Sequence, residues 1–441
     1  MAHDLLEAAR GATALARKAG AQEAAAVASR ARSVTVEWRD GKLEKVTEAT
    51  TRGIALEIYA DGRYGAVSTS DLRPEALERF IADAVALTRA LEKDPYRALP
   101  DPALYRGQAA VDLDLEDRAH GSLTPARRLD LARAAEAAAR SAKGAGAILS
   151  VSTGFSDTLG ESWRVHTNGF EGSRRGTDFH VWAQVSARDA DGRRPEDWDS
   201  GGARHLADVP AAEDVGRRAA ARALGRLGSR KGGSARTALV VEARAAGRLV
   251  AALFEPLSAA ALQQKRSFLE GKAGEVIGSP RLHLGDDPLV PRGLGSRLYD
   301  AEGLAARRFP VFEKGVLRSY YVDTYYGRKL GLPPTTRGAS NLAWQLGESS
   351  REALVAGVRD GILVTGFLGG NSNGTTGEFS HGLQGFRIRA GALAEPLSEM
   401  NVSGDHRSLW KGLVAVGNDP YPWSPMRTPT LVFEDVQVAG V

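Results

Sequence analysis

The residues with the clearest capacity for chemistry lie close together late in the chain. Glu378, Ser380 and His381 place a carboxylate, a hydroxyl and an imidazole within four positions. In sequence they resemble parts of a nucleophilic triad, but a triad is defined by geometry, and this stretch lacks the Gly-x-Ser-x-Gly elbow. We therefore do not expect serine catalysis from these three residues.

A glycine-rich loop comes directly before them. Residues 369–377 read Gly-Gly-Asn-Ser-Asn-Gly-Thr-Thr-Gly. The lysine and the following helix of a phosphate-binding loop are missing. Two interpretations stay open: a mobile or tightly turning loop, or a loop whose backbone must approach a ligand or partner closely, which glycine permits.

An aromatic cluster supplies a second candidate surface. Asp323 lies among Tyr320, Tyr321, Tyr325 and Tyr326. Such an amphipathic set could hold a peptide, although aromatic packing in a β core is the more common role.

Metal ligands are scarce in this sequence. None of the eight histidines forms a pair at the i, i+4 spacing that places two imidazoles on one face of a helix. The pair His166 and His180 falls on separate predicted strands. The chain has no cysteine, which excludes disulfides, thiolate nucleophiles and cysteine-ligated metals.

Charge and hydropathy limit the classes of partner expected for this protein. The 58 Lys and Arg residues nearly balance 54 Asp and Glu residues, giving a net charge of +4. Short basic pairs such as Arg174-Arg175 and Arg217-Arg218 are interpreted as solvated surface, so no nucleic-acid partner is expected. No apolar run is long enough to span a membrane, and the N-terminus lacks a signal-peptide pattern. We expect a cytoplasmic protein.

The N-terminal part of the chain is predicted to begin with a helix followed by an antiparallel meander. Residues 3–19 have a helical pattern, and alternating apolar residues at 33–38 and 54–59 predict strands. Asp40-Gly41 and Asp61-Gly62 are hairpin turn signals. A helix with Pro74 in its first turn follows.

The middle of the chain combines helices and strands. A proline-rich connector covers 94–112, and residues 189–200 have the composition of a loop. Helices are predicted at 124–142 and 211–227, and strands at 147–155, 163–167 and 179–186. The Gly/Ser/basic run 228–233 predicts a boundary.

The remainder predicts a mainly β unit. A strand at 237–242 precedes an apolar helical stretch, 243–262, which Pro256 interrupts. Short alternating runs follow at 312–322, 361–367, 385–389 and 430–438. We predict an α+β fold in which an N-terminal antiparallel sheet with helices precedes a mainly β C-terminal domain, with segments at 1–93, 113–229 and 234–441.

Several segments in order resemble the TldD/PmbA family. They are Leu298–Gly303, Asp323–Leu332, Gly369–Gly382, Gly385-Phe386 and Val414–Asp419, together with Ser68–Leu72 and His166–Gly169 nearer the N-terminus. Each segment alone is weak evidence, but the ordered set covers nearly the whole chain.

This resemblance implies a division of labour. TldD-type members bind zinc through a helical His-Glu-x-x-x-His motif and a distant cysteine, and the zinc activates water. The corresponding stretch here, residues 242–257, contains no histidine, and the chain has no cysteine. The resemblance therefore implies a TldE (PmbA)-type subunit with no catalytic residue, metal or cofactor of its own. Zinc is expected in a TldD-type partner, in a heterodimer or larger assembly, and a homodimer is possible for the chain alone.

The family also implies a substrate class, unfolded or short peptides, including precursors of ribosomal peptide natural products. An extended chain can enter an enclosed chamber and form backbone hydrogen bonds there. The residues expected to line the cavity or contact the peptide are Asp323, Tyr325, Asn371, Asn373, Glu378 and His381. Two alternatives stay open: a divergent homodimeric peptidase or peptide-modifying enzyme, and a regulatory binding protein acting on DNA gyrase.

Overall fold

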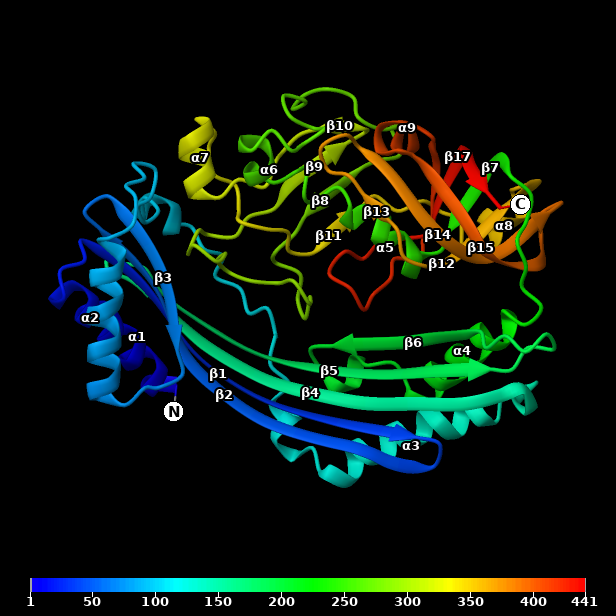
Figure 1. The fold of residues 1–441 in the computed structure, drawn as a ribbon, viewed down its shortest axis with the longest axis horizontal. Helices are drawn as coiled ribbons and strands as arrows, with labels where there is room; N and C mark the ends of the chain where they lie inside the picture. Colours follow the sequence, from blue (N-terminus) through cyan, green and yellow to red (C-terminus); the bar gives the residue numbers. More distant parts are fainter. Residues whose placement is uncertain (1, 441) are drawn as a thin grey trace.

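A long antiparallel sheet forms the lower half of the molecule in the computed structural model, which describes residues 2–440 (Figure 1). Within that range its strand order is β3-β2-β1-β4-β5-β6. The strands are β1 Glu23–Arg39, β2 Lys42–Ala60, β3 Arg63–Thr69, β4 Ile148–His166, β5 Glu171–Ala187 and β6 Glu196–Ala203. The central pairing runs from Ala25↔His166 to Arg39↔Ser152. The first two predicted segments therefore share one sheet.

The hairpin turns form where the sequence predicts them. Asp40 and Gly41 have φ angles of 47° and 79°, and Asp61 and Gly62 have φ angles of 53° and 73°. Positive φ at both central positions is the geometry of the tight turn that matches the right-handed twist of the flanking strands.

Helices cover one face of this sheet. At one end lie α1 (Ala2–Lys18) and α2 (Pro74–Thr88), and at the other lie α3 (Pro125–Arg140) and α4 (Ala212–Gly225) (Figure 1). Small residues such as Ala12 and Ala219 are fully buried and let the helices pack closely on the strands. No described helix has the length and apolarity needed to cross a membrane.

The sequence predictions were wrong in two places on this sheet. The segments 147–155 and 163–167 belong to a single strand, β4, because its central residues pair with β1 and β5 although their apolar alternation is weak. The predicted loop 189–200 contains most of β6, whose polar residues pair with β5 from Phe179↔Ala203 to Ser186↔Glu196.

The C-terminal half lies over the opposite face of the sheet (Figure 1). Among the described residues, one of its sheets follows the order β12-β7-β17-β15-β14-β13, with β16 beside β17, and a smaller one the order β10-β9-β8-β11. Its helices are short: α5 Ala243–Ala251, α6 Ala259–Gln263, α7 Thr324–Leu330, α8 Arg351–Ala356 and α9 His406–Lys411. The strands are β7 Ala235–Val241, β8 Leu284–Asp286, β9 Phe309–Glu313, β10 Val316–Leu317, β11 Leu342–Trp344, β12 Asp360–Phe367, β13 Asn371–Ser372, β14 Glu378–Arg389, β15 Ala392–Asp405, β16 Leu413–Val416 and β17 Leu431–Ala439. The predicted α+β class, with its N-terminal antiparallel sheet, is confirmed.

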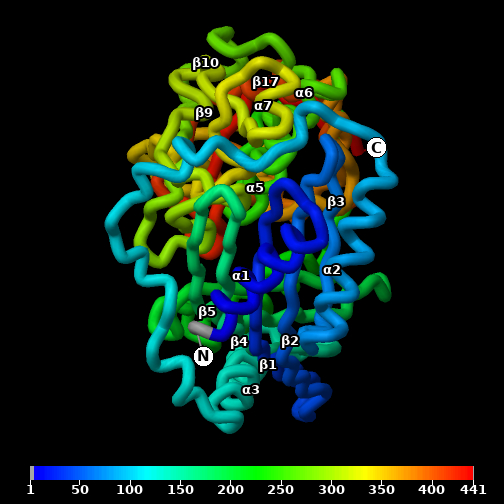
Figure 2. Tube along the Cα trace, turned by 90° about the vertical axis from the view of Figure 1, so that its left-hand side faces the viewer, coloured from blue at the N-terminus to red at the C-terminus, as the bar shows by residue number. Residues whose placement is uncertain are grey.

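The connector between α2 and α3 crosses the width of the molecule before descending to α3 (Figure 2). Helix α7 packs on it: Arg328 donates hydrogen bonds to the carbonyls of Tyr96, Ala98 and Leu99, and the Tyr325 hydroxyl donates to Asp94 at 2.6 Å. The connector thus joins the N-terminal sheet to the C-terminal half at this end.

At the other end a buried ion network joins the two halves. The Glu242 carboxylate, directly before α5, lies 2.6 Å from Arg222 of α4. Arg244 of α5 lies 3.1 Å from Asp197 of β6. Glu242 and Asp197 are at most 4% exposed. Because an unpaired buried charge is costly, these pairs fix the position of α5 over β6.

A neutral polar chain anchors the glycine-rich loop in the C-terminal core. Ser372 Oγ lies 3.1 Å from His381 Nε2 and 3.0 Å from His406 Nε2. Both imidazoles are at most 2% exposed and pack against Phe379. Burial lowers the pKa of His381, and it lowers that of His406 to about 4, to which the nearby His381 also contributes. At neutral pH both rings are therefore uncharged, and the hydroxyl can donate to one ring and accept from the other.

The ion network predicts an asymmetric mutational response. Glu242→Leu leaves Arg222 without its nearest carboxylate and should lower the free energy of unfolding by about 3–5 kcal/mol. The double variant Glu242→Leu/Arg222→Met should recover a large part of that loss because no unpaired charge remains. Urea unfolding of both variants measures the difference, and a double variant no more stable than Glu242→Leu would contradict this assignment.

The buried histidines predict acid sensitivity. The folded protein holds the pKa of His406 at about 4, below the ordinary 6.5, so protons bind the unfolded chain preferentially. This contribution to stability is present above pH 6.5 and is lost as pH falls toward 4, by on the order of 3 kcal/mol. His406→Gln should therefore reduce the loss of stability between pH 6.5 and 4 in denaturant titrations. An equal loss of stability between pH 6.5 and 4 in the variant and in the unchanged protein would contradict the prediction. Burial also lowers the pKa of His166 to about 3, so His166 supplies a separate acid-sensitive contribution in both of these proteins.

Candidate functional site

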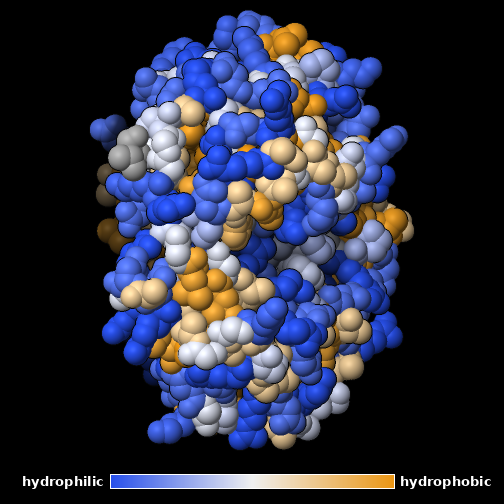
Figure 3. Space-filling view, turned by 90° about the vertical axis from the view of Figure 1, so that its right-hand side faces the viewer, coloured by the Kyte–Doolittle hydropathy of each residue, from blue (hydrophilic) through white to orange (hydrophobic). Residues whose placement is uncertain are grey.

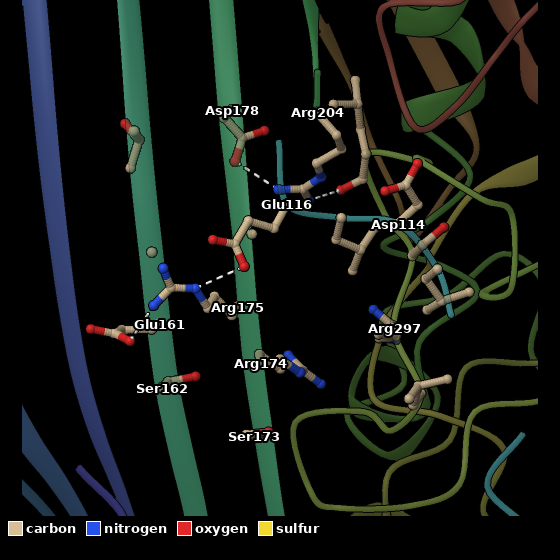
Figure 4. A pocket seen from close by; sticks show the side chains of 18 of the residues that line it. Asp114, Glu116, Glu161, Ser162, Ser173, Arg174, Arg175, Asp178, Arg204 and Arg297 are labelled. Carbon is tan, nitrogen blue, oxygen red and sulfur yellow. Dashed lines mark hydrogen bonds and ion pairs between the residues drawn. The ribbon is translucent and has the colours of Figure 1, made fainter. Parts of the chain in front are cut away.

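A cavity of about 770 Å³ opens between the sheet and the C-terminal half. Strands β4 and β5 form one wall, and residues 294–299 form the other (Figure 4). We call it the seam cavity.

The alternation of the strands explains why the cavity wall is polar. Phe155 of β4 and Phe179 of β5 point to the helix-covered face and are fully buried. Positions of opposite parity, among them Thr158, Ser162 and Asp178, line the cavity. Because successive side chains in a strand point to opposite faces, one pair of strands supplies both a core and a polar wall.

Tyr299 lies at the centre of the upper wall. A Cβ atom at Gly172 would lie 2.7 Å from the Tyr299 ring, so glycine lets this ring approach β5. The Arg174 guanidinium lies 4.5 Å from the centre of the ring, within range of a cation–π contact. Arg174 also donates to the carbonyl of Tyr299, which ties β5 to the loop that carries the ring.

Several arginines that line the cavity form ion pairs. Arg175 lies 2.8 Å from Glu116 and 2.9 Å from Glu161, and Arg204 lies 2.7 Å from Asp178 (Figure 4). These guanidiniums already have carboxylate partners.

Glu302, three residues after Tyr299, links the cavity wall to α7. Its carboxylate accepts hydrogen bonds from the Thr324 amide at 2.9 Å and the Thr324 hydroxyl at 2.7 Å. Burial, with contributions from Asp300 and Asp323, raises the pKa of Glu302 to about 7. The carboxyl is thus poised to exchange a proton near neutral pH, although its contacts show a helix-positioning role.

A second recess, of about 490 Å³, lies beside α5. Its lining includes Arg226, Arg244 and Arg248 as well as Trp198, whose ring lies 4.5 Å from the Arg244 guanidinium. Figure 3 views this end of the molecule and shows it hollowed between the two halves.

The residues on α5 do not fit a zinc ion. Arg244 is bound to Asp197 and to the Thr365 carbonyl, and Arg248 donates to the Gly370 carbonyl at 2.8 Å. Within residues 2–440 no group of three or more His, Cys, Asp or Glu side chains is arranged to hold a metal. A divalent cation beside α5 would meet guanidinium groups where it needs ligands.

The structure separates the predicted site residues into two groups. Asp323 and Tyr325 lie at α7, where the Asp323 carboxylate accepts from the Tyr326 amide at 2.7 Å and Tyr325 bonds Asp94. The other predicted residues lie together on the β13–β14 hairpin.

Each residue of the hairpin group has a local partner. Asn371, at an exposed position, pairs with Ser380 across the hairpin, and the side-chain Oδ1 of Asn373 accepts from the amides of Thr375 and Thr376. The exposed Glu378 accepts from the Thr376 hydroxyl at 3.1 Å. His381 points inward to Ser372, while the Ser380 hydroxyl faces Asn401, so Glu378, Ser380 and His381 form no triad.

The loop needs its glycines for a physical reason. Gly370 has a φ of 88°, and a Cβ there would lie 2.1 Å from the Ser380 carbonyl. The close approach is made to the protein's own β14 strand, which explains this glycine without a ligand.

Sequence reasoning missed the arginines of the seam cavity. Arg174-Arg175 was interpreted as solvated surface, yet both residues line the cavity, and Arg218 of another such pair bonds the buried Asp199 at 2.7 Å. The even spacing of Arg174 and Asp178 on a strand with buried odd positions was the available signal. The sequence did not show which part of the chain would form the opposite wall of the cavity.

Known proteins of similar sequence cover nearly the whole chain. Residues 24–88, 119–227 and 234–440 match the models of domain 1, the central domain and the C-terminal domain of the PmbA/TldA metallopeptidases. Metalloprotease PmbA of Escherichia coli O157:H7 is 26% identical over 97% of this chain and 95% of its own length. A zinc metalloprotease TldD homolog of Saccharolobus solfataricus is 27% identical over 32% of this chain and 35% of its own length.

Solved structures agree. A crystal structure from Bacteroides thetaiotaomicron, described as a putative modulator of DNA gyrase, is 38% identical and has a TM-score of 0.95 over 99% of this chain and 98% of that one. TldE from Thermococcus kodakarensis, at 20% identity, has the same fold, with a TM-score of 0.84 over 98% of this chain and all of that one. The chain belongs to the PmbA/TldD metallopeptidase family.

Proposed function

We propose that this chain is the non-catalytic, TldE-type subunit of a two-component metallopeptidase. A TldD-type partner would hold the zinc, and this chain would contribute a wall of the chamber in which extended peptides are cut. The family relationship supports the peptidase class.

The bonding of the side chains on α5 is the observation that supports the proposal most directly. Arg244 and Arg248 occupy this helix, and both are bound to neighbouring elements. Through these contacts the helix joins β6, β12 and the glycine-rich loop. A family member built in this way needs another subunit to supply a metal-bound water.

The seam cavity supports a peptide as the ligand. Its volume of about 770 Å³ lies within the range of small-molecule sites and holds a few residues of extended chain, not a folded domain. Its walls combine apolar surface at Leu113 and Tyr299 with polar groups from β4 and β5. Such a mixture suits a peptide backbone with varied side chains.

Reconstitution tests the division of labour. The purified chain, dialysed and analysed by inductively coupled plasma mass spectrometry, should hold well under one zinc per chain and should not cleave unstructured peptides. Co-expressed with a TldD-type protein carrying His-Glu-x-x-x-His, it should co-purify, and the pair should hold zinc and cleave.

Two outcomes would contradict the proposal. Near-stoichiometric zinc with cleavage by the chain alone would support the divergent homodimeric peptidase. A TldD-type protein that cleaves equally well without this chain would remove its proposed role.

The glycine-rich loop gives a second prediction. Deleting residues 369–377 would also remove Ser372, which bridges two buried histidines, so a smaller change at the exposed tip is cleaner. If the tip contacts the peptide, Asn373→Ala should raise the KM of the reconstituted pair several-fold, because the amides of Thr375 and Thr376 lose their acceptor. Thr237→Ser, on β7, serves as the control. Unchanged KM and kcat in Asn373→Ala would exclude the loop tip from peptide binding.

A further inference from the structure

Three guanidinium groups lie near Tyr299: Arg174 and Arg297 line the seam cavity from opposite walls, and Arg164 lies on the strand next to Arg174. Arg164 of β4 and Arg174 of β5 lie on the cavity face of the sheet, on neighbouring strands where Arg164 pairs with Gly172. Arg297 belongs to the opposite wall, and Figure 4 shows the Arg174 side chain extending from β5 toward that wall.

None of the three has a carboxylate within ion-pair distance in the described chain. Arg174 donates hydrogen bonds to the carbonyls of Tyr299 and Asp300. Arg297 donates to the carbonyls of Ala339 and Gly338 and to the Thr336 hydroxyl, and its Nε atom is buried without a partner. Within residues 2–440, no side-chain hydrogen bond or ion pair involves the Arg164 guanidinium, although the backbone of Arg164 pairs with β1 and β5.

Two carboxylates act on the cluster from beyond ion-pair distance, Glu57 on Arg164 and Asp300 on Arg164 and Arg174, and the oxygens of Asp300 are already used. Asp300 Oδ1 accepts from the amides of Glu302 and Leu304, and Oδ2 accepts from the Arg337 amide and the Thr336 hydroxyl. Its carboxylate oxygens therefore bond the neighbouring loops and none of the three guanidiniums.

Other arginines of the cavity behave differently. Arg175, Arg204 and Arg30 each pair with a carboxylate that lines the cavity. Within residues 2–440, the arginines of the lining therefore fall into two sets, one paired with carboxylates and the other, which includes Arg174 and Arg297, without them.

The pKa shifts of two of these arginines also favour a bound anion. Burial lowers the pKa of Arg164 and of Arg174. Repulsion from Arg174 lowers that of Arg164 further, and Arg297 does the same to Arg174, while Glu57 opposes the shift at Arg164 and Tyr299 and Asp300 oppose it at both. Like charges held together in a partly desolvated site favour an anion that would neutralise them.

We propose that Arg164, Arg174 and Arg297 form a subsite that binds a carboxylate of an extended peptide, either its C-terminus or an acidic side chain. This inference rests on the proposed peptide-binding function and adds the chemistry by which the substrate is oriented. Guanidinium groups suit this role because they can bind a carboxylate through two parallel hydrogen bonds.

The charges around the cluster favour a single carboxylate over a polyanion. Glu116, Glu161, Asp178 and Asp114 line the same cavity. A nucleic-acid strand, with a phosphate at every nucleotide, would bring further negative charges against these groups. A peptide can place one carboxylate in the cluster and neutral backbone along the rest of the wall.

Fluorescence anisotropy with the isolated full chain tests the subsite. Three labelled peptides of one sequence are compared: a free C-terminal acid, a C-terminal amide, and an amide with one internal Gln replaced by Glu. We expect at least one carboxylate-bearing peptide to bind about tenfold more tightly than the neutral amide, the gain typical of one charge-assisted hydrogen bond. The arm that gains identifies the carboxylate as terminal or side-chain.

Variants assign the effect to the cluster. Arg174→Gln should abolish the preference for the acid, and Arg174→Lys should keep part of it because the charge remains. Arg389→Gln makes the same change of net charge on an exposed hairpin, where Arg389 pairs with Glu395, and should leave the preference intact. Thermal unfolding of each variant confirms that it is folded, and Arg164→Gln provides a second test if Arg174→Gln does not fold.

The outcomes separate this inference from the proposed function. Equal binding of acid and amide peptides would overturn the carboxylate subsite and leave the peptide-binding role standing. Binding of no peptide would count against both. Tight, salt-sensitive binding of a single-stranded oligonucleotide that displaces the peptide would replace the carboxylate with phosphate and overturn the inference.

Discussion

The arrangement of the molecule depends on burying three carboxylates between its two halves. Glu242, Asp197 and Asp199 are each at most 4% exposed. Arg222 lies 2.6 Å from Glu242 and 3.8 Å from Asp199, so one guanidinium of α4 links a carboxylate of the C-terminal half to one of β6. Separating the halves would leave these charges unpaired in a partly closed site, which costs more than the pairs contribute. The network therefore acts mainly by fixing one arrangement of the two halves. Its contribution to the free energy of unfolding is the smaller effect.

That geometry gives the sheet two unlike faces. The helix-covered face is apolar, with Phe155 and Phe179 fully buried. The other face would need a second apolar layer if the C-terminal half packed on it closely. Instead the halves are held at their two ends, by the α7–connector contacts and by the ion network, and a polar cavity remains between. Alternation along β4 and β5 is the local property that makes this possible.

The sequence predicted local elements well and the seam poorly. The turns at Asp40-Gly41 and Asp61-Gly62 carry their own signals, because few residues other than Asp, Asn and Gly adopt positive φ readily. The strand β6 escaped prediction because its sequence, Glu-Asp-Trp-Asp-Ser-Gly-Gly-Ala, is polar: Asp197 and Asp199 occupy its buried positions and are balanced by arginines from α4 and α5. A buried charge cannot be told from a solvated one without knowing its partner. For the same reason the pair Arg174-Arg175, and with it the cavity, was not visible as a site.

Helix α5 is held in place by cationic side chains that bond to the elements around it. Arg244 reaches Asp197, the Thr365 carbonyl and the ring of Trp198, and Arg248 reaches the loop at Gly370. A metal site requires neutral or anionic donors with an open coordination position, whereas here cationic side chains occupy the helix and their donors are already bonded. Building a metal site on α5 would thus require removing contacts that position β6 and the loop, so individual histidine substitutions would lose structure before they gained a ligand set. In the proposed two-subunit enzyme, the same contacts would make this chain a fixed wall against which a partner's metal can act.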